Sequence, residues 1–156
     1  MKKICIGKYV ATHGIKGEIR IKSNFKYKDK VFLIGNKIYL DNYEFIINSY
    51  RVHKEYDMVT LKGIDNINQI INFKGCLVYI DKDNLKLNQN EYLDSDLINF
   101  QVYMKNEYKG NVSDIKYLVK DKKLLVINNN LVPFELIQNI DFNNKKIILE
   151  EVDGLL

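Results

Sequence analysis

Short segments in which apolar and polar residues alternate run through most of the chain, and this alternation constrains the fold more than any other feature. Glu18–Lys22 alternates charged and apolar side chains, which predicts a strand with one buried face. A short helix is expected between Gly63 and Gly75, with Asp65 as its cap, because three isoleucines there share one helical face. The other strands are expected at Ile4–Val10, Lys37–Leu40, Tyr43–Ile47, Met58–Leu61 and Leu77–Ile80. Six short strands with one helix predict a closed or nearly closed β-barrel.

A polar stretch divides the chain into two strand-rich halves. Asp81–Asn90 contains only two apolar residues, both leucine, which is typical of a linker. We therefore expect a first domain over residues 1–82, a linker over 83–90 and a second all-β domain over 91–156. The only proline, Pro133, is expected at an edge, a turn or a strand end, because it lacks an amide hydrogen. Strands of the second half are expected at Phe100–Met104, Asn111–Leu118, Leu124–Ile127 and Lys146–Leu149.

The composition indicates a folded cytoplasmic protein. Apolar residues make up 46% and charged residues 28% of the 156 residues, so disorder is not expected. No run approaches the roughly 20 apolar residues that span a bilayer. Lys8 interrupts the apolar N-terminus before any signal-peptide cleavage site appears. Cys5 and Cys76 provide no disulfide framework. We therefore expect a cytoplasmic monomer with no membrane partner.

Positive charge is concentrated at the N-terminal end of the chain. Residues 1–30 hold nine Lys or Arg and two acidic residues, which gives +7 against +4 for the whole chain. The remaining residues hold 15 basic and 18 acidic side chains, which gives −3. The N-terminal face is therefore a candidate contact for a polyanion, with an ordinary solvated lysine-rich surface as the alternative.

The connection between the first two expected strands carries two glycines, a histidine and a lysine. Glycine lets backbone amides turn toward a phosphate, and Lys16 supplies positive charge there. Gly14–Gly17 literally matches the GXXG loop of KH domains, but that loop lies between helices and this one lies between strands. Taken alone, the pattern favours a glycine-bent barrel turn without a ligand.

Catalytic and metal-binding patterns are weak. The two histidines and two cysteines lack the spacing of zinc ligands, and no Ser or Cys lies in a nucleophile elbow. Asp94 and Asp96 are close, but such a pair more often caps a helix or carries surface charge than acts as acid and base. Eleven tyrosines interleaved with lysines suit base stacking and barrel packing equally. We expect a binding protein that is not an enzyme and needs no cofactor.

Several motifs keep one order and spacing along the chain. They are Gly7-Lys8, His13–Glu18, Gly75, Glu91-Tyr92, Asp96–Ile98, Lys109–Val112, Pro133-Phe134, Ile140-Asp141 and Gly154–Leu156. In these motifs the sequence resembles the RimM family of ribosome maturation factors, the bacterial 16S rRNA processing proteins, over essentially its whole length.

The resemblance implies an all-β fold. Its parts are an N-terminal six-stranded β-barrel, similar to barrels of translation factors and carrying one short helix, and a C-terminal PRC-type β-barrel. It implies a protein that binds the free small (30S) ribosomal subunit and assists assembly of its head and 16S rRNA processing. The implied partners are 16S rRNA and the nineteenth small-subunit ribosomal protein. Residues placed by charge and motif at the rRNA are Lys8, His13, Lys16, Arg20 and Lys22. Those placed at the ribosomal protein are Tyr92, Leu93 and Asp96.

The chain departs from the family pattern in the second domain. The family has two adjacent aromatics associated with ribosome binding, but here Tyr92 is followed by Leu93, and the next two positions also differ. Asn99 stands at a usual glycine, which is tolerable because Asn accepts positive φ better than most residues. Lys120–Lys123 replaces a Gly-x-Asn-Asp-like turn, so no role is carried over to it.

Two other functions stay open at this point. A generic RNA-binding barrel without ribosomal specificity predicts similar affinity for unrelated structured RNA. A hydrolase or flavin-binding barrel requires a concave site with convergent ionisable groups, and the sequence shows no motif for such a site.

Overall fold

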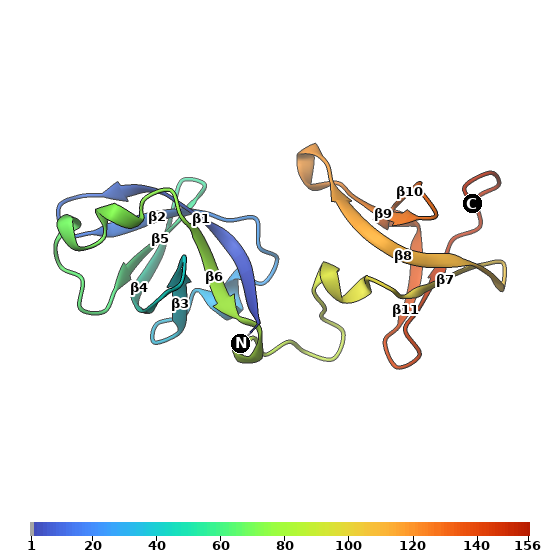
Figure 1. Ribbon diagram of the computed structural model, residues 1–156, viewed down its shortest axis with the longest axis horizontal. Coiled ribbons are helices and arrows are strands. Elements are labelled where there is room, and N and C mark those ends of the chain that lie inside the picture. The colour runs from blue at the N-terminus through green and yellow to red at the C-terminus, as the bar shows by residue number, and fades with distance from the viewer. Residues whose placement is uncertain (1) are drawn as a thin grey trace. The chain divides into compact units, whose positions relative to one another are not determined.

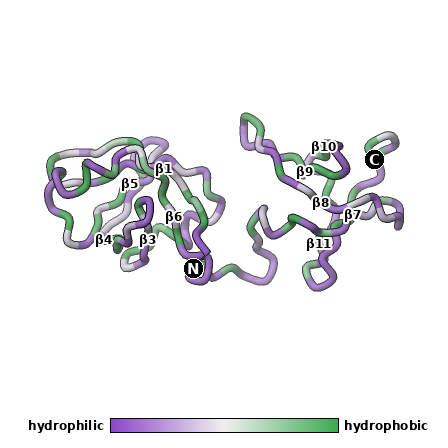
Figure 2. The backbone as a smooth tube through the Cα atoms, in the orientation of Figure 1, coloured by the Kyte–Doolittle hydropathy of each residue, from purple (hydrophilic) through white to green (hydrophobic). Residues whose placement is uncertain are grey.

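The computed structural model describes residues 2–156, and the chain forms two compact units. The first extends to Leu87 and the second runs from Asn88 to Leu156, so the division falls within the polar stretch 83–90. Strands dominate both units (Figure 1), which confirms the predicted all-β fold. Hydrophobic and hydrophilic positions are interspersed along the backbones of both units (Figure 2).

Six strands of the first unit close into a barrel, as the sequence predicts. They are β1 (Lys3–His13), β2 (Glu18–Lys22), β3 (Lys37–Leu40), β4 (Tyr43–His53), β5 (Tyr56–Leu61) and β6 (Leu77–Asp81). Their order is β1-β2-β5-β4-β3-β6, and β6 pairs with β1 to close the ring. Strands β1 and β4 are longer than predicted. The cause in β4 is a bulge between Ile47 and Ser49, which breaks the period-two pattern at the point where the predicted strand ends.

The pleat of β2 separates the barrel core from the charged outer surface. Ile19 and Ile21 are fully buried, whereas Glu18, Arg20 and Lys22 alternate with them and reach solvent to different degrees. The core that they join draws apolar side chains from all six strands. Burial of this β2 face therefore fixes which basic residues lie on the outside of the barrel.

The helix predicted between Gly63 and Gly75 is present as two 3-10 turns, η1 (Ile67–Gln69) and η2 (Ile71–Phe73). Its cap is Asn66 and not Asp65. The Asn66 side chain accepts the amide of Asn68 at 2.8 Å, and the Gln69 side chain accepts the Asn66 amide at 3.0 Å. This reciprocal capping box starts η1 one residue later than predicted.

The α-helix of the first unit, α1 (Lys28–Val31), lies in a segment for which the sequence predicts no element. One ion pair ties it to the barrel, because Lys28 Nζ lies 2.8 Å from Asp57 Oδ2. Asp57 is only 2% exposed and also accepts a hydrogen bond from the Tyr50 hydroxyl at 2.5 Å. Burial and this carboxylate raise the pKa of Tyr50. A further 3-10 turn, η3 (Lys82–Asn84), follows β6.

The second unit is a six-stranded sheet in the order β10-β9-β8-β7-β12-β11. Laid flat, six strands would place the outer two about 24 Å apart. The chain runs from Pro133, the last residue of β10, to Ile137, the first of β11, in four steps that span at most about 15 Å. The sheet is therefore curled as a barrel requires, and η6 rather than a β-ladder joins its two edge strands.

The four strands expected in the second unit are present, although Phe100 and Leu118 lie just outside the observed strands, and two further strands were not predicted. The observed strands are β7 (Gln101–Met104), β8 (Glu107–Tyr117), β9 (Lys123–Ile127), β10 (Asn130–Pro133), β11 (Ile137–Asp141) and β12 (Lys146–Leu149), with the 3-10 turns η4 (Asp94–Leu97), η5 (Val119–Asp121) and η6 (Phe134–Leu136). Pro133 ends an edge strand, as predicted. Asn99 adopts a φ of 71°, which explains why Asn is tolerated where the family has glycine.

Candidate functional site

The five residues that the sequence places at a nucleic acid all lie on β1, β2 or the turn between them. Lys8, His13, Lys16 and Lys22 are exposed and Arg20 is half-buried. They share the outer side of the barrel because their apolar neighbours on the same strands fill the core. The structure therefore places all five on one β-hairpin.

Two of these lysines face each other across the hairpin. Lys8 on β1 is the direct cross-strand partner of Lys22 on β2, and both are exposed. Like charges in this position repel each other and lower stability. A bound polyanion would remove that repulsion, so this pair favours a phosphate-bearing ligand at this surface.

The β1–β2 turn is held in place by its two glycines. Gly14 and Gly17 adopt φ values of 79° and 88°, which residues other than glycine rarely adopt. A Cβ atom on Gly17 would lie 3.1 Å from the Ile64 side chain, and the Ile15 carbonyl accepts the Ile67 amide at 2.8 Å. The glycines therefore serve turn geometry and close packing. Lys16 lies between them and is exposed.

Arg20 is the most constrained of the five predicted residues. Its guanidinium lies over the ring of Tyr56, 5.0 Å from the centroid, and its Nη2 lies 3.5 Å from Nδ1 of His13. Its Nε is buried and has no hydrogen-bond partner among the described residues. The Tyr56 ring thus helps to hold the guanidinium in place, and guanidinium groups bind oxyanions through their N–H donors.

A second arginine joins this surface from β4. Arg51 donates two hydrogen bonds to Glu18, from Nε at 2.9 Å and from Nη2 at 2.7 Å. This fork of bonds holds the pKa of the Glu18 carboxyl below its usual range. The Arg51 side chain is still 49% exposed, so the pair lies at the surface.

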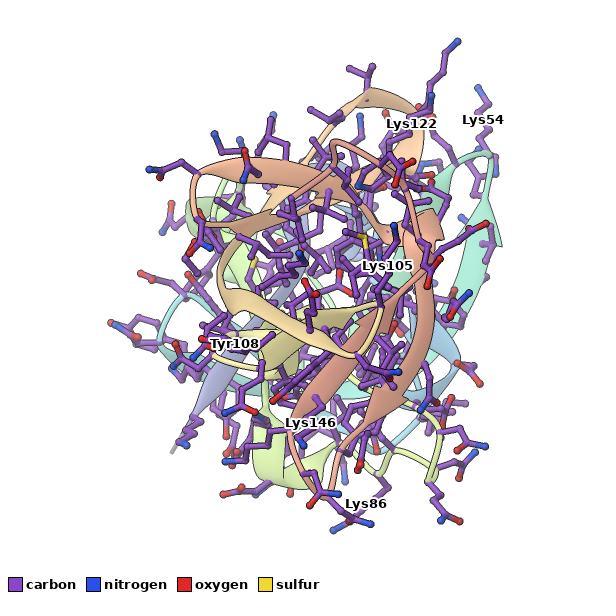
Figure 3. The ribbon with its side chains drawn as sticks, turned by 90° about the vertical axis from the view of Figure 1, so that its right-hand side faces the viewer. Lys54, Lys86, Lys105, Tyr108, Lys122 and Lys146 are labelled. Atoms are coloured by element: carbon purple, nitrogen blue, oxygen red, sulfur yellow. The ribbon has the colours of Figure 1, made fainter. Side chains whose placement is uncertain are left out.

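The two histidines of the chain meet at the same place. The ring centroids of His13 and His53 are 6.0 Å apart, with the rings tilted by 47°. Burial and the neighbouring positive charge, chiefly Arg51 and Lys54, lower the pKa of His53. Lys54 lies in the β4–β5 turn, and its side chain points outward (Figure 3).

We call His13, Glu18, Arg20, Arg51 and His53 the barrel cluster. Sequence analysis placed His13 and Arg20 in a nucleic-acid surface and missed the roles of Glu18, Arg51 and His53. The sequence pattern did not show that β4 continues to His53, because the bulge after Ile47 interrupts the alternation of that strand.

The structure assigns local roles to the three residues expected at a ribosomal protein. Tyr92 is half-buried and packs against Phe142, with ring centroids 5.4 Å apart. Leu93 is only 8% exposed, so little of its side chain is accessible from the surface of this unit. Asp96 accepts the Leu93 amide at 3.1 Å and thereby stabilises the start of η4. Of the three, Tyr92 alone presents a large, partly exposed side chain.

Asp94 organises a neighbouring polar group in the second unit. It accepts hydrogen bonds from Lys123 Nζ at 3.0 Å and from the Tyr117 hydroxyl at 3.1 Å. Burial and the Asp94 charge raise the pKa of Tyr117 to about 12. The hydroxyl therefore stays protonated and donates to the carboxylate.

Two further properties of residues 2–156 bear on function. No three His, Cys, Asp or Glu side chains converge as metal ligands would. Over the same residues, no helix has the length and apolar character needed to cross a membrane.

Comparison with known proteins relates both halves of the chain to one family. A profile of the RimM N-terminal domain matches residues 4–85. Proteins named ribosome maturation factor RimM from Staphylococcus aureus strains RF122 and MRSA252 are 33% identical to the chain, with 99% of each sequence covered. A 16S ribosomal RNA processing protein RimM of Pseudomonas aeruginosa has 18% identity, covers 97% of this chain and 98% of its own, and gives a TM-score of 0.47. From the match over residues 4–85 and the 33% identity over nearly the full length, the chain belongs to the RimM family.

Proposed function

We propose that this protein is a cytoplasmic ribosome maturation factor that binds the free small (30S) ribosomal subunit. It assists assembly of the head of the subunit and processing of 16S rRNA. The observation that carries this proposal is the relationship to proteins of that name over 99% of the chain. The role is one of binding and not of catalysis.

The first unit is the proposed contact with 16S rRNA. Its β1–β2 hairpin presents cationic or protonatable side chains on one outer face, and two of them form the unfavourable Lys8–Lys22 pair. Arginine and lysine contacts with phosphates supply affinity and positioning without reading sequence. The members of this proposed surface are Lys8, His13, Lys16, Arg20 and Lys22.

The second unit is the proposed contact with the nineteenth small-subunit ribosomal protein. Residues 91–156 carry 11 acidic and 8 basic side chains, a net charge of −3 that suits a basic partner. Tyr92 is the proposed anchor, since a tyrosine offers large apolar area and a polar tip. Its contact with Phe142 restricts the ring before binding, which reduces the entropy lost on association.

Depletion of the protein from its cells tests the proposal. We expect 16S rRNA with unprocessed ends and an excess of free subunits over joined ribosomes, both restored by re-expression. Normal processing and a normal subunit ratio after complete depletion would contradict a role in maturation. Binding of unrelated structured RNA as tightly as 16S rRNA would favour a generic RNA-binding barrel.

A further inference from the structure

The barrel cluster combines two guanidiniums, two imidazoles and one carboxylate on the outer face of the first unit. Resting on the function proposed above, we propose that Arg51 and His53, with His13 and Arg20, bind a phosphate and an adjacent unpaired base of single-stranded RNA. When no RNA is bound, the Glu18 carboxylate accepts the hydrogen bonds of Arg51. This assigns a binding role to two residues of β4, outside the β1–β2 hairpin.

The guanidiniums provide the phosphate-binding part of this site. Arg20 is half-buried, and its guanidinium lies over the Tyr56 ring, 5.0 Å from the centroid. Arg51 is half-exposed and held by Glu18 through bonds of 2.7 and 2.9 Å. A guanidinium presents its donors in a planar fork that matches a phosphate, and contacts that restrict the side chain before binding lower the entropy cost.

The imidazoles provide the base-contacting part. His13 is exposed, His53 is half-buried, and their ring centroids are 6.0 Å apart. Proteins that bind single-stranded RNA place aromatic rings beside basic groups in this way, because an unpaired base offers a flat face for stacking. A duplex hides the faces of its bases, so the geometry favours an unpaired strand.

Glu18 acts as an internal competitor for the phosphate. Its side chain is 15% exposed and both of its oxygens bond Arg51. An RNA phosphate that binds Arg51 must displace this carboxylate or tolerate its negative charge nearby. Replacing Glu18 by Gln removes the charge and preserves the shape, so it should strengthen RNA binding.

Protonation of His53 should be coupled to RNA binding. The groups that face it are Arg51 on its own strand, Lys54 in the turn, His13 on β1, and Arg20 and Glu18 on β2; Tyr56 on β5 is its cross-strand partner. All but Glu18 and Tyr56 are cationic or become so on protonation, and with burial they disfavour the imidazolium. A phosphate reverses this field. Affinity should therefore rise as the pH falls, by about tenfold for each unit by which RNA raises the histidine pKa.

The test measures binding of a single-stranded oligoribonucleotide of about 12 nucleotides between about pH 5.5 and about pH 8, using the full-length chain. Arg51→Gln should weaken binding about tenfold. His53→Gln should flatten the pH dependence, and Glu18→Gln should tighten binding. Lys74→Gln, which removes one exposed charge outside the barrel cluster, should change affinity less than about twofold. Melting temperatures of all variants show whether they fold.

Three results would overturn the inference. One is unchanged affinity in folded Arg51→Gln and His53→Gln proteins. Another is equal affinity for the strand and for its duplex. The third is equal competition by a glutamate-rich peptide, which would assign the site to an acidic protein. The site and the ribosomal function can fail separately. If Arg51→Gln and His53→Gln lose oligoribonucleotide binding but the wild-type protein does not bind small subunits, the RNA site is supported and the ribosomal function is rejected. If small-subunit binding is unchanged in Arg51→Gln and His53→Gln, the proposed RNA site is rejected and the ribosomal function stands.

Discussion

Replacing Lys22 by glutamate should stabilise the protein and weaken its binding to rRNA at the same time. Lys22 lies directly across the β1–β2 hairpin from Lys8, and both side chains are exposed. The substitution converts a repulsive cross-strand pair into an attractive one, which is worth about 0.5–1 kcal/mol. For a unit of this size, that gain raises the melting temperature by about 2–8 °C. The effect should be greatest at low ionic strength, because salt screens exposed charges.

The same substitution removes one phosphate contact from the proposed rRNA surface. The slope of log affinity against log salt should become shallower by about 0.9 for duplex rRNA. The assay combines thermal melting with salt-dependent binding to a 16S rRNA fragment. Lys74→Glu is the matched control, because it makes the same charge change in the exposed turn after η2. An unchanged or lower melting temperature, together with an unchanged salt slope, would exclude both the cross-strand repulsion and the phosphate contact of Lys22.

Three further predictions test separate parts of the structure. Tyr92→Ala should cost about 2 kcal/mol in binding to the purified nineteenth small-subunit protein, whereas Tyr92→Phe should keep the packing on Phe142 and most of the affinity; unchanged affinity in the alanine variant would exclude the anchor role. Because the pKa of Glu18 is lowered in the folded protein, its ion pair stabilises the fold above about pH 4.5 and is lost as the pH falls through the lowered value. Glu18→Gln should therefore show a smaller fall in melting temperature between about pH 5 and about pH 3, and parallel curves would count against this. Limited proteolysis should cut first within residues 83–90 and leave two folded fragments, and a single resistant core across both units would contradict separate folding.

The sequence predicted the barrel because the period-two pattern is strong where one face of a strand is buried. In β2, Ile19 and Ile21 turn inward, and this burial sets the register of the whole strand. The pattern failed at the bulge after Ile47, so the continuation of β4 to His53 was not predicted. It also gave no signal for α1, which is only four residues long and is stabilised by the tertiary ion pair of Asp57 with Lys28.

The candidate site was predicted only as far as local pattern allows. Lys8 and Lys22 followed from charge and alternation, but their direct opposition depends on the strand register. The bonds between Glu18 and Arg51 join residues 33 positions apart, so no local motif contains them. Leu93 was expected at an interface because the family resemblance places the second of two adjacent aromatics at its position, yet its burial is a tertiary property.

Co-sedimentation of the purified protein with purified ribosomal particles is the direct test of binding to the small subunit. We expect binding to free small subunits and not to joined ribosomes, with affinity that falls steeply as salt increases. Lys16→Glu combined with Lys22→Glu should weaken this binding chiefly at low salt, while Lys74→Glu should leave it intact. Equal recovery of the wild-type protein with both particles, or with neither, would contradict specific binding to the free small subunit.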